Sequence, residues 1–315
     1  MSTPGTPTYD QLRIFLTVVE VGSFAAAGRK LHRATSAITY GVANLEAQLG
    51  LTLFAREGTR RPELTPSGRS VLAEARAIAH SMDGLRAKVK GLHQGLEPEV
   101  TVVVDVMWPS AWLGPVLNAF ARAFPAVSLR LYVESLGSVA AMVTERRAAF
   151  GISGPLSMTV PGLEHLVMGS IPMIPVAAPS HPLAQEQVKP GASRDHIQLV
   201  LTDRSKLSAG RDFGVGSDRT WRLGDLGAKH QLLREGIGWG GMPEHLVEAD
   251  LAAGTLVRLD LPDRDAVSYT FDGIYRIDTP PGPTASWLIR RFVEYVAGLP
   301  REELASASQR AAAAL

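Results

Sequence analysis

The chain of 315 residues contains no cysteine. Without thiols it can form neither a disulfide nor a Cys-ligated zinc site, and the absence is typical of a reducing compartment. Its eight histidines are scattered without the H-x-x-x-H type of spacing that a helical zinc site requires. We therefore expect no disulfide framework and no metal site.

Long hydrophobic runs are also missing. The longest apolar run near the N-terminus, Ile14 to Val19, is broken by Thr17 and flanked by Arg13 and Glu20. It is too short for a signal peptide and far short of the roughly 20 residues that span a bilayer. We expect a soluble cytoplasmic protein with no membrane partner.

Catalytic signatures are scarce, because neither G-x-S-x-G, nor a P-loop, nor paired carboxylates stand out. The one candidate is the glycine pattern Gly236, Gly238 and Gly241 in "EGIGWGGMP". A dinucleotide fingerprint follows a strand and opens a helix, whereas this pattern follows the helical "LGAKHQLLRE" and precedes Pro243. A helix C-cap with a tight turn is favoured, and a nicotinamide or flavin oxidoreductase is the alternative. We predict no catalytic residue, no cofactor and no enzyme.

The charge of the chain is divided unevenly along its length. Up to His93, twelve Lys and Arg oppose seven Asp and Glu, whereas twenty oppose twenty-four in the remainder. This asymmetry indicates a basic N-terminal module that faces a polyanion, with an ordinary solvated face as the alternative. A length of 315 residues and 45% apolar content suffice for two or three compact units.

The stretch "KLHRATSAITYGVANLE" (30–46) has helical periodicity with an unusual exposed face. Spacings of four, three and four residues put one apolar face into a core: Ile38, Val42, Leu45 and Leu49. The opposite face is narrow and uncharged, with Ser36, Tyr40 and Ala43 at its centre and Thr39 and Asn44 on its flanks. Such a face can lie close against another surface and offer hydroxyl groups to it.

The neighbouring segments give this helix a context. Ser23 can N-cap a helix "FAAAGRKL", and a short turn at 32–34 leads into the next helix, which is helix-turn-helix geometry. Upstream, "YDQLRIFLTVVEVG" predicts a third helix that ends at Gly22. Downstream, "LTLFAREGTRRPELTPSG" predicts a basic wing that contains Arg56, Arg60 and Arg61.

At these residues the chain resembles the LysR-type transcriptional regulators. The similarity runs through "GSFAAAGRKLHRATSAITYGVANLEAQLGLTLFAR" and "LTPSG", and continues through "FPAVSLRL" (124–131) and "HPLA" (181–184). Where that family usually opens its recognition helix with Ser-Gln-Pro, this chain has Ala34, Thr35 and Ser36, and Tyr40 stands at a frequently basic position.

A major groove admits one helix, whose first turns read base edges with short polar side chains. We expect double-stranded DNA as a partner, with base or phosphate contacts from Thr35, Ser36, Thr39, Tyr40 and Asn44. Phosphate contacts are expected from Arg33, Arg56, Arg60 and Arg61, and Ser23 completes the candidate DNA-binding set. For each hydroxyl taken alone, a helix cap or a solvent contact is the alternative.

The segment after Thr65 and Pro66 predicts one long helix, since Thr suits an N-cap and Pro the first helical position. Apolar residues recur at gaps of three or four: Leu72, Ala75, Ile78, Met82, Leu85, Val89 and Leu92. Such a seam is typical of a coiled coil, and the alternative is a stripe that packs on its own domain. We predict a homodimer, with a homotetramer implied by the resemblance.

From Pro98 onward, strand-like and helical segments alternate, which predicts a parallel α/β architecture. The expected fold is therefore multi-domain: an all-α winged helix-turn-helix domain (1–65), a linker helix (66–97), an α/β effector domain (98–300) and a tail (301–315). The resemblance implies two lobes similar to those of periplasmic binding proteins, one near 98–164 and 270–300, the other near 165–269.

A ligand in such a fold binds at the carboxyl ends of strands, between the lobes. The first strand ends in "DVMWPSAW" (105–112), whose turn brings Ser110 to the start of a helix, and Ser110 is the predicted primary contact with the effector. Trp108, Pro109, Ser153 and Thr202 complete the predicted effector site, and Trp108 has core packing as its alternative. The bulky turn favours an aromatic or flat apolar body over a small hydroxy acid, and the free N–H groups at the helix start suit an anion such as a carboxylate. We predict a transcriptional regulator switched by a small molecule, with RNA polymerase as a further partner; a solute-binding protein is the alternative.

Overall fold

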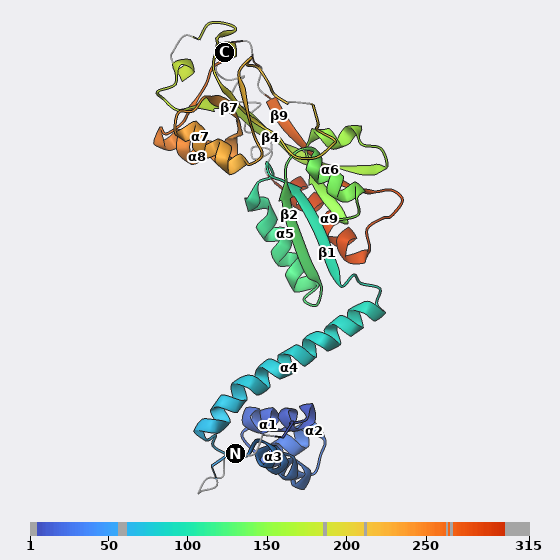
Figure 1. Cartoon of the computed structure of the whole chain (residues 1–315). Coiled ribbons are helices and arrows are strands. Elements are labelled where there is room, and N and C mark those ends of the chain that lie inside the picture. The colour runs from blue at the N-terminus through green and yellow to red at the C-terminus, as the bar shows by residue number, and fades with distance from the viewer. Residues whose placement is uncertain are drawn as a thin grey trace. The chain divides into compact units, whose positions relative to one another are not determined.

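The computed structural model describes residues 5–55, 62–184, 188–210, 213–262, 264 and 267–299. The chain forms two compact units, Met1–Lys90 and Gly91–Leu315 (Figure 1). The wing arginines Arg56, Arg60 and Arg61 and the predicted tail lie outside the described residues.

Three short helices form the first unit: α1 (Tyr9–Val21), α2 (Phe24–Leu31) and α3 (Thr35–Leu49). Local sequence sets their ends. Thr8 and Gln11 form a capping box before α1, and Gly22 ends that helix in the left-handed conformation that glycine adopts without strain. These ends agree with the helix-turn-helix order that the sequence predicts.

The core of the first unit lies between α3 and its neighbours. Ile38, Val42 and Leu45 are buried, as the periodicity predicts. Phe54 stands edge-to-face with both Phe15 and Phe24, at 5.5 and 5.6 Å between ring centroids. Phe54 also pairs with Leu64 in an antiparallel bridge, so the two ends of the predicted wing meet at this core.

A 28-residue helix, α4 (Pro66–His93), follows the wing. The Thr65 hydroxyl accepts a hydrogen bond from the Gly68 N–H at 2.9 Å, which caps its first turn. The predicted apolar seam divides in two. Leu72 and Ala75 pack on the core of the first unit, whereas Ile78, Leu85, Val89 and Leu92 are 44–56% exposed.

The second unit is built on one nine-stranded sheet. Its strands are β1 (Glu99–Asp105), β2 (Ser128–Glu134), β3 (Phe150–Ser153), β4 (Leu163–Ala177), β5 (Gln198–Leu201), β6 (Thr220–Leu223), β7 (Trp239–Pro243), β8 (Val257–Arg258) and β9 (Val267–Arg276). They follow the order β2-β1-β3-β9-β4-β7-β5-β6, and β8 pairs with β4.

The sheet is mixed rather than uniformly parallel, which corrects the expectation from the sequence. Strands β1, β2 and β3 run parallel, as do β5, β6 and β7. The long strands β4 and β9 pair with each other antiparallel and join the two parallel groups. We call the part built on β1–β3 the first lobe and the part built on β5–β7 the second lobe.

Helices pack around this sheet: α5 (Ser110–Ala123), α6 (Gly137–Thr144), α7 (Leu226–Arg234), α8 (Glu244–Ala253) and α9 (Pro283–Ala297). The C-terminal helix α9 returns to the first lobe, where Trp287 stands edge-to-face with Phe124. Short 3-10 turns occur at Pro155–Thr159, Pro182–Ala184 and Ala192–Asp195.

The glycine pattern forms a tight turn, as its sequence context predicts. Gly236 and Gly238 have φ of 79° and 71° directly after α7, and Gly241 lies within β7. Among the described residues, no His, Cys, Asp or Glu cluster has the make-up of a metal site. Within the same residues no single helix is long and apolar enough to cross a membrane, although the bent pair α1 and α2 meets that test together.

Candidate nucleic-acid interface and effector site

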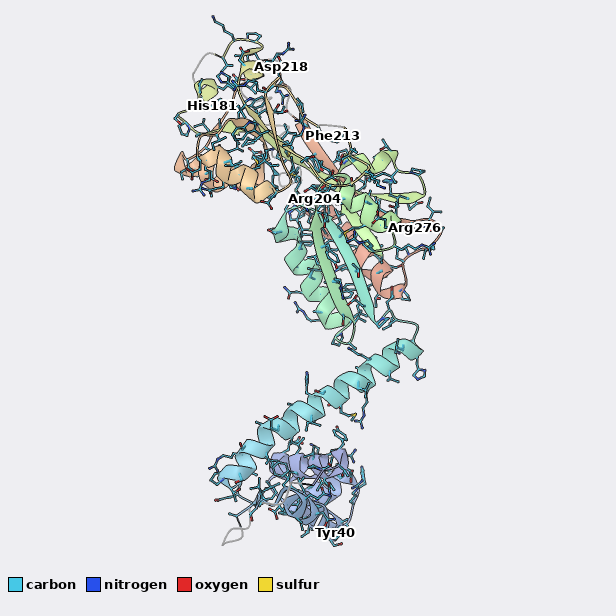
Figure 2. All side chains as sticks on the ribbon, viewed as in Figure 1. Tyr40, His181, Arg204, Phe213, Asp218 and Arg276 are labelled. Carbon is cyan, nitrogen blue, oxygen red and sulfur yellow. The ribbon has the colours of Figure 1, made fainter. Side chains whose placement is uncertain are left out.

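The outer face of α3 is exposed and free of charged side chains. Thr35, Ser36, Thr39 and Tyr40 are all exposed, and the side chain of Tyr40 is 69% exposed. It projects from the surface of the first unit (Figure 2). Asn44, further along the helix, is half-buried. The structure therefore brings the five predicted reading residues onto one helix, with four of them accessible.

Two of the candidate hydroxyls already have local partners. The Thr39 hydroxyl donates to the Thr35 carbonyl at 3.1 Å, and the Ser23 hydroxyl accepts from the Ala26 N–H at 3.4 Å as the N-cap of α2. By contrast, Ala34 begins α3 without a side-chain cap. The first N–H groups of α3 therefore lack a side-chain acceptor and can receive a phosphate oxygen.

Arg33 lies beside this helix end but is held by a carboxylate. Its two terminal nitrogens donate to Asp10 at 2.6 and 3.0 Å, and this hydrogen bonding lowers the pKa of Asp10. Asp10 lies in the first turn of α1, so the ion pair fixes the guanidinium between two helices. If Arg33 contacts a DNA phosphate, its guanidinium must be shared between that phosphate and Asp10.

In the second unit the strand order marks two positions where a ligand can bind. In the first lobe, β1 lies between β2 and β3. In the second lobe, β5 lies between β6 and β7. Ligands of open α/β sheets bind outside the carboxyl ends of strands at such points. Ser153 ends β3, Ser110 begins α5 after β1, and Thr202 follows β5.

These three predicted contacts differ in exposure. Ser110 is exposed, Thr202 is half-buried, and Ser153 is fully buried with a hydroxyl that has no hydrogen-bond partner. An unpartnered buried hydroxyl is uncommon and is the kind of group that a ligand can satisfy. Pro109, also a predicted contact, is buried as the N-cap of α5.

Trp108 lies in the hydrophobic core. Its ring is 4% exposed and stands edge-to-face with Trp112, Phe271 and Phe292 at 5.0 to 6.3 Å between centroids. These contacts match the packing alternative that the sequence left open for this residue.

Sequence reasoning missed a polar contact between the lobes. The backbone N–H and the hydroxyl of Ser138, at the start of α6, donate to the Asp203 carboxylate at 2.7 and 3.0 Å. The Ser208 hydroxyl donates to the other oxygen of Asp203. The sequence offered one signal for this contact, which is that an acidic residue, Asp203, directly follows the predicted contact Thr202. A carboxylate is stabilised at a helix N-terminus, here that of α6.

Asp105, at the end of β1, is a second residue that the sequence did not single out. Its carboxylate is 1% exposed, and burial raises its pKa to about 6. The Met107 N–H and the Tyr269 hydroxyl donate to it at 2.9 and 3.0 Å. These bonds to its charged form oppose the effect of burial.

Lys229, on α7, is a buried cation in the second lobe. It is 4% exposed, burial lowers its pKa to about 8, and its ammonium donates to the Gly241 carbonyl at 2.7 Å. Strand β5 pairs with β7 between Gln198 and Trp239. Beyond that pair, the Lys229 ammonium donates a hydrogen bond to the Gly241 carbonyl of β7.

Two family models match the chain. Residues 9–69 match "Bacterial regulatory helix-turn-helix protein, lysR family", and residues 93–297 match "LysR substrate binding domain". The chain belongs to the LysR family of transcriptional regulators. Members of this family are regulators rather than enzymes, with a DNA-binding helix-turn-helix domain and a domain for a small-molecule effector.

Individual relatives of this LysR-family protein are distant. It is 28% identical over 257 residues to the uncharacterized regulator YeeY of Escherichia coli, covering 80% of this chain and 82% of YeeY. It is 27% identical over 290 residues to AceR of Acinetobacter baumannii, covering 89% and 94%. A mutant of Corynebacterium glutamicum OxyR has a similar fold, with a TM-score of 0.51 and 19% identity over 98% of each chain.

Proposed function

We propose that this LysR-family regulator reads its operator with the exposed face of α3. The observation that supports this proposal is a recognition-helix face without charge, on which Tyr40 and three small hydroxyl side chains are exposed. Arg56, Arg60 and Arg61 of the predicted wing supply the phosphate contacts, together with the uncapped N–H groups that begin α3.

Selection of binding sites from random double-stranded DNA tests this function. The full chain should enrich a sequence with two-fold symmetry, because two identical reading heads require two half-sites. Enrichment of no common sequence would contradict sequence-specific reading. The enriched site is then the operator for the variants discussed below.

The effector is proposed to bind at the strand ends of the second unit. Ser110 and Ser153 supply contacts from the first lobe, and Thr202 supplies one from the second. The unpartnered hydroxyl of Ser153 supports this placement. We propose a small aromatic carboxylate or a related phenolic compound as the ligand, because donors at a helix start suit an anion.

A thermal-shift screen of such compounds tests the effector site. An active compound should raise the melting temperature of the parent, and Ser110→Ala combined with Thr202→Val should remove that shift while operator binding persists. Equal stabilisation of the parent and the double variant would place the ligand elsewhere.

The assembly is proposed to be a homodimer or a homotetramer held in part by α4. Its exposed seam of Ile78, Leu85, Val89 and Leu92 supports this, since such a stripe is normally covered by a second helix. We place the regulator in the cytoplasm, and contact with RNA polymerase is its proposed route to activation.

A further inference from the structure

Three loops leave the carboxyl ends of β1, β2 and β3, and each leads to a polar residue near the proposed effector site. The loop after β1 leads to Ser110, the loop after β2 leads to Ser138, and the loop after β3 follows directly on Ser153. A ligand site made of loops requires something that fixes the loops relative to one another.

Backbone groups from all three loops act on the Asp105 carboxylate. The Met107 N–H, from the loop after β1, donates to it at 2.9 Å. Burial raises the pKa of Asp105, and the backbones of Leu136 and Gly154, in the loops after β2 and β3, act in the opposite direction. The Tyr269 hydroxyl, from β9, donates at 3.0 Å. One carboxylate therefore interacts with the three loops and with β9.

The loop after β2 depends on this bond most directly. Leu136 has φ of 50° and ψ of −125°, a conformation that is unfavourable for a residue with a Cβ and persists only where its surroundings hold it. The interaction of its backbone with the Asp105 carboxylate, which favours the charged form of Asp105, contributes to that hold. Ser138 follows two residues later, so the direction of its N–H and hydroxyl is set from Leu136.

The loop after β3 is tied to β9 through the same carboxylate. Gly154 lies against the ring of Tyr269, and a Cβ on Gly154 would overlap the tyrosine hydroxyl. Tyr269 is stacked edge-to-face on Phe271 at 5.2 Å, which limits its movement. Since β9 pairs with β3 and also with β4, this contact reaches the strands that both lobes share.

We propose that Asp105 is the positioning residue of the effector site, which holds the three loops of the first lobe in the arrangement that binds the ligand. The proposal rests on the proposed effector function and goes beyond it, because Asp105 need not touch the ligand. Its action is exerted through Ser110, Ser138 and Ser153.

Hydrogen exchange of the full chain tests the positioning without any ligand. Asp105→Asn keeps the shape of the side chain but places an NH2 group against N–H and O–H donors. Amides in 106–110, 136–138 and 154–156 should exchange about ten-fold faster, as expected when each loop loses its interaction with the carboxylate. Unchanged exchange in all three loops would overturn the proposal.

Glu97 provides a matched control within the same unit. Its carboxylate accepts from the N–H groups of Thr284 and Ala285 at 2.9 and 3.3 Å and caps α9, just before the opposite end of β1. Glu97→Gln should therefore accelerate exchange at the start of α9 and leave the three loops unchanged. Loosening of the three loops by Glu97→Gln would mean that general loss of stability explains the effect.

Two further variants keep the carboxylate, in case Asp105→Asn fails to fold. Tyr269→Phe removes one donor, and Gly154→Ala displaces the tyrosine ring. Both should accelerate exchange in 154–156 more than in 106–110. Parental exchange in both variants would also overturn the proposal.

Binding of benzoate, used as the probe, gives the functional readout. Asp105→Asn should weaken its Kd about ten-fold while Glu97→Gln retains the parental value. Equal Kd values for Asp105→Asn and the parent would overturn the positioning role. If the parent itself does not bind benzoate, the proposed aromatic carboxylate class is wrong, and hydrogen exchange still decides the role of Asp105.

Discussion

At the scale of single residues, chemistry depends on whether a charge or a hydroxyl is exposed, partnered or buried. Tyr40 is open to solvent on α3, whereas Arg33 is paired with Asp10, and Lys229 of α7 is buried with its ammonium on the Gly241 carbonyl of β7. The amino-acid composition alone does not show which side chains are exposed, paired or buried. Their different surroundings lead to two predictions.

Tyr40→Ala should reduce sequence preference rather than overall affinity. Loss of one base contact is expected to cost about 1–3 kcal/mol at the operator and almost nothing on random DNA. Fluorescence anisotropy with both DNAs measures the ratio. Arg60→Ala with Arg61→Ala is the contrasting variant, which should weaken both complexes and reduce the salt slope by about 2. Equal losses on both DNAs for Tyr40→Ala would remove the readout role.

Lys229 should make stability depend on pH in the alkaline range. Its pKa is lowered from 10.5 to about 8, so the unfolded chain binds more protons between these values and the free energy of unfolding rises with pH there. Relative to Lys229→Met, the parent should gain up to about 3 kcal/mol from pH 8 to 10.5. Denaturant unfolding measures this, with Lys88→Met on the exposed side of α4 as control. Parallel pH profiles for the parent and Lys229→Met would contradict it.

At the scale of elements, the apolar seam of α4 is covered in its first part and exposed in its later part. Its first part, with Leu72 and Ala75, completes the core of the first unit. Its later part remains exposed, and Leu85 within it is 55% exposed. The helical period is the same in both parts, so only the tertiary surroundings separate them.

Leu85→Asp should shift the assembly toward a smaller species. A carboxylate in a helix-helix seam loses its water without gaining a partner, which is strongly unfavourable. Light scattering at several concentrations measures the change, and Ala73→Asp on the exposed side of α4 is the control. An unchanged mass for Leu85→Asp would mean that other surfaces hold the oligomer.

At the scale of the whole molecule, the chain separates DNA reading from ligand sensing into two compact units. The excess of positive charge lies in the first and the excess of negative charge in the second. Within the second unit, β4 and β9 run through both lobes, and the Ser138–Asp203 contact adds a side-chain link between them. A ligand between the lobes would act on that link.

Asp203→Ala should loosen this link and leave the rest of the second unit intact. Ser138 would lose the acceptor of both its N–H and its hydroxyl, at a cost of about 1–3 kcal/mol in the free energy of unfolding. In this variant, amides at the start of α6 should exchange faster than in the parent, and amides elsewhere in the second unit should exchange at the parental rate. Asp218→Ala, at an exposed carboxylate of the second lobe, is the control. Parental exchange at Ser138 would show that the link carries no stability.

The sequence by itself determined the local features of this protein. Periodicity and caps specified α1, α2 and α3, the buried face of α3 and the turn after α7, because each depends on residues within a few positions of one another. The resemblance to LysR-type regulators supplied the family, which the family models confirmed.

Only the tertiary structure decided the contacts between distant segments. Asp105 and Tyr269 are 164 residues apart, and Ser138 and Asp203 are 65 apart. No periodic pattern links such pairs, since the order of strands in the sheet determines which loops meet. The same holds for Trp108 and Lys229, whose burial depends on the elements that cover them. Side-chain burial is a property of the packed fold, and it converts an ordinary Asp or Lys into a group with a specific role.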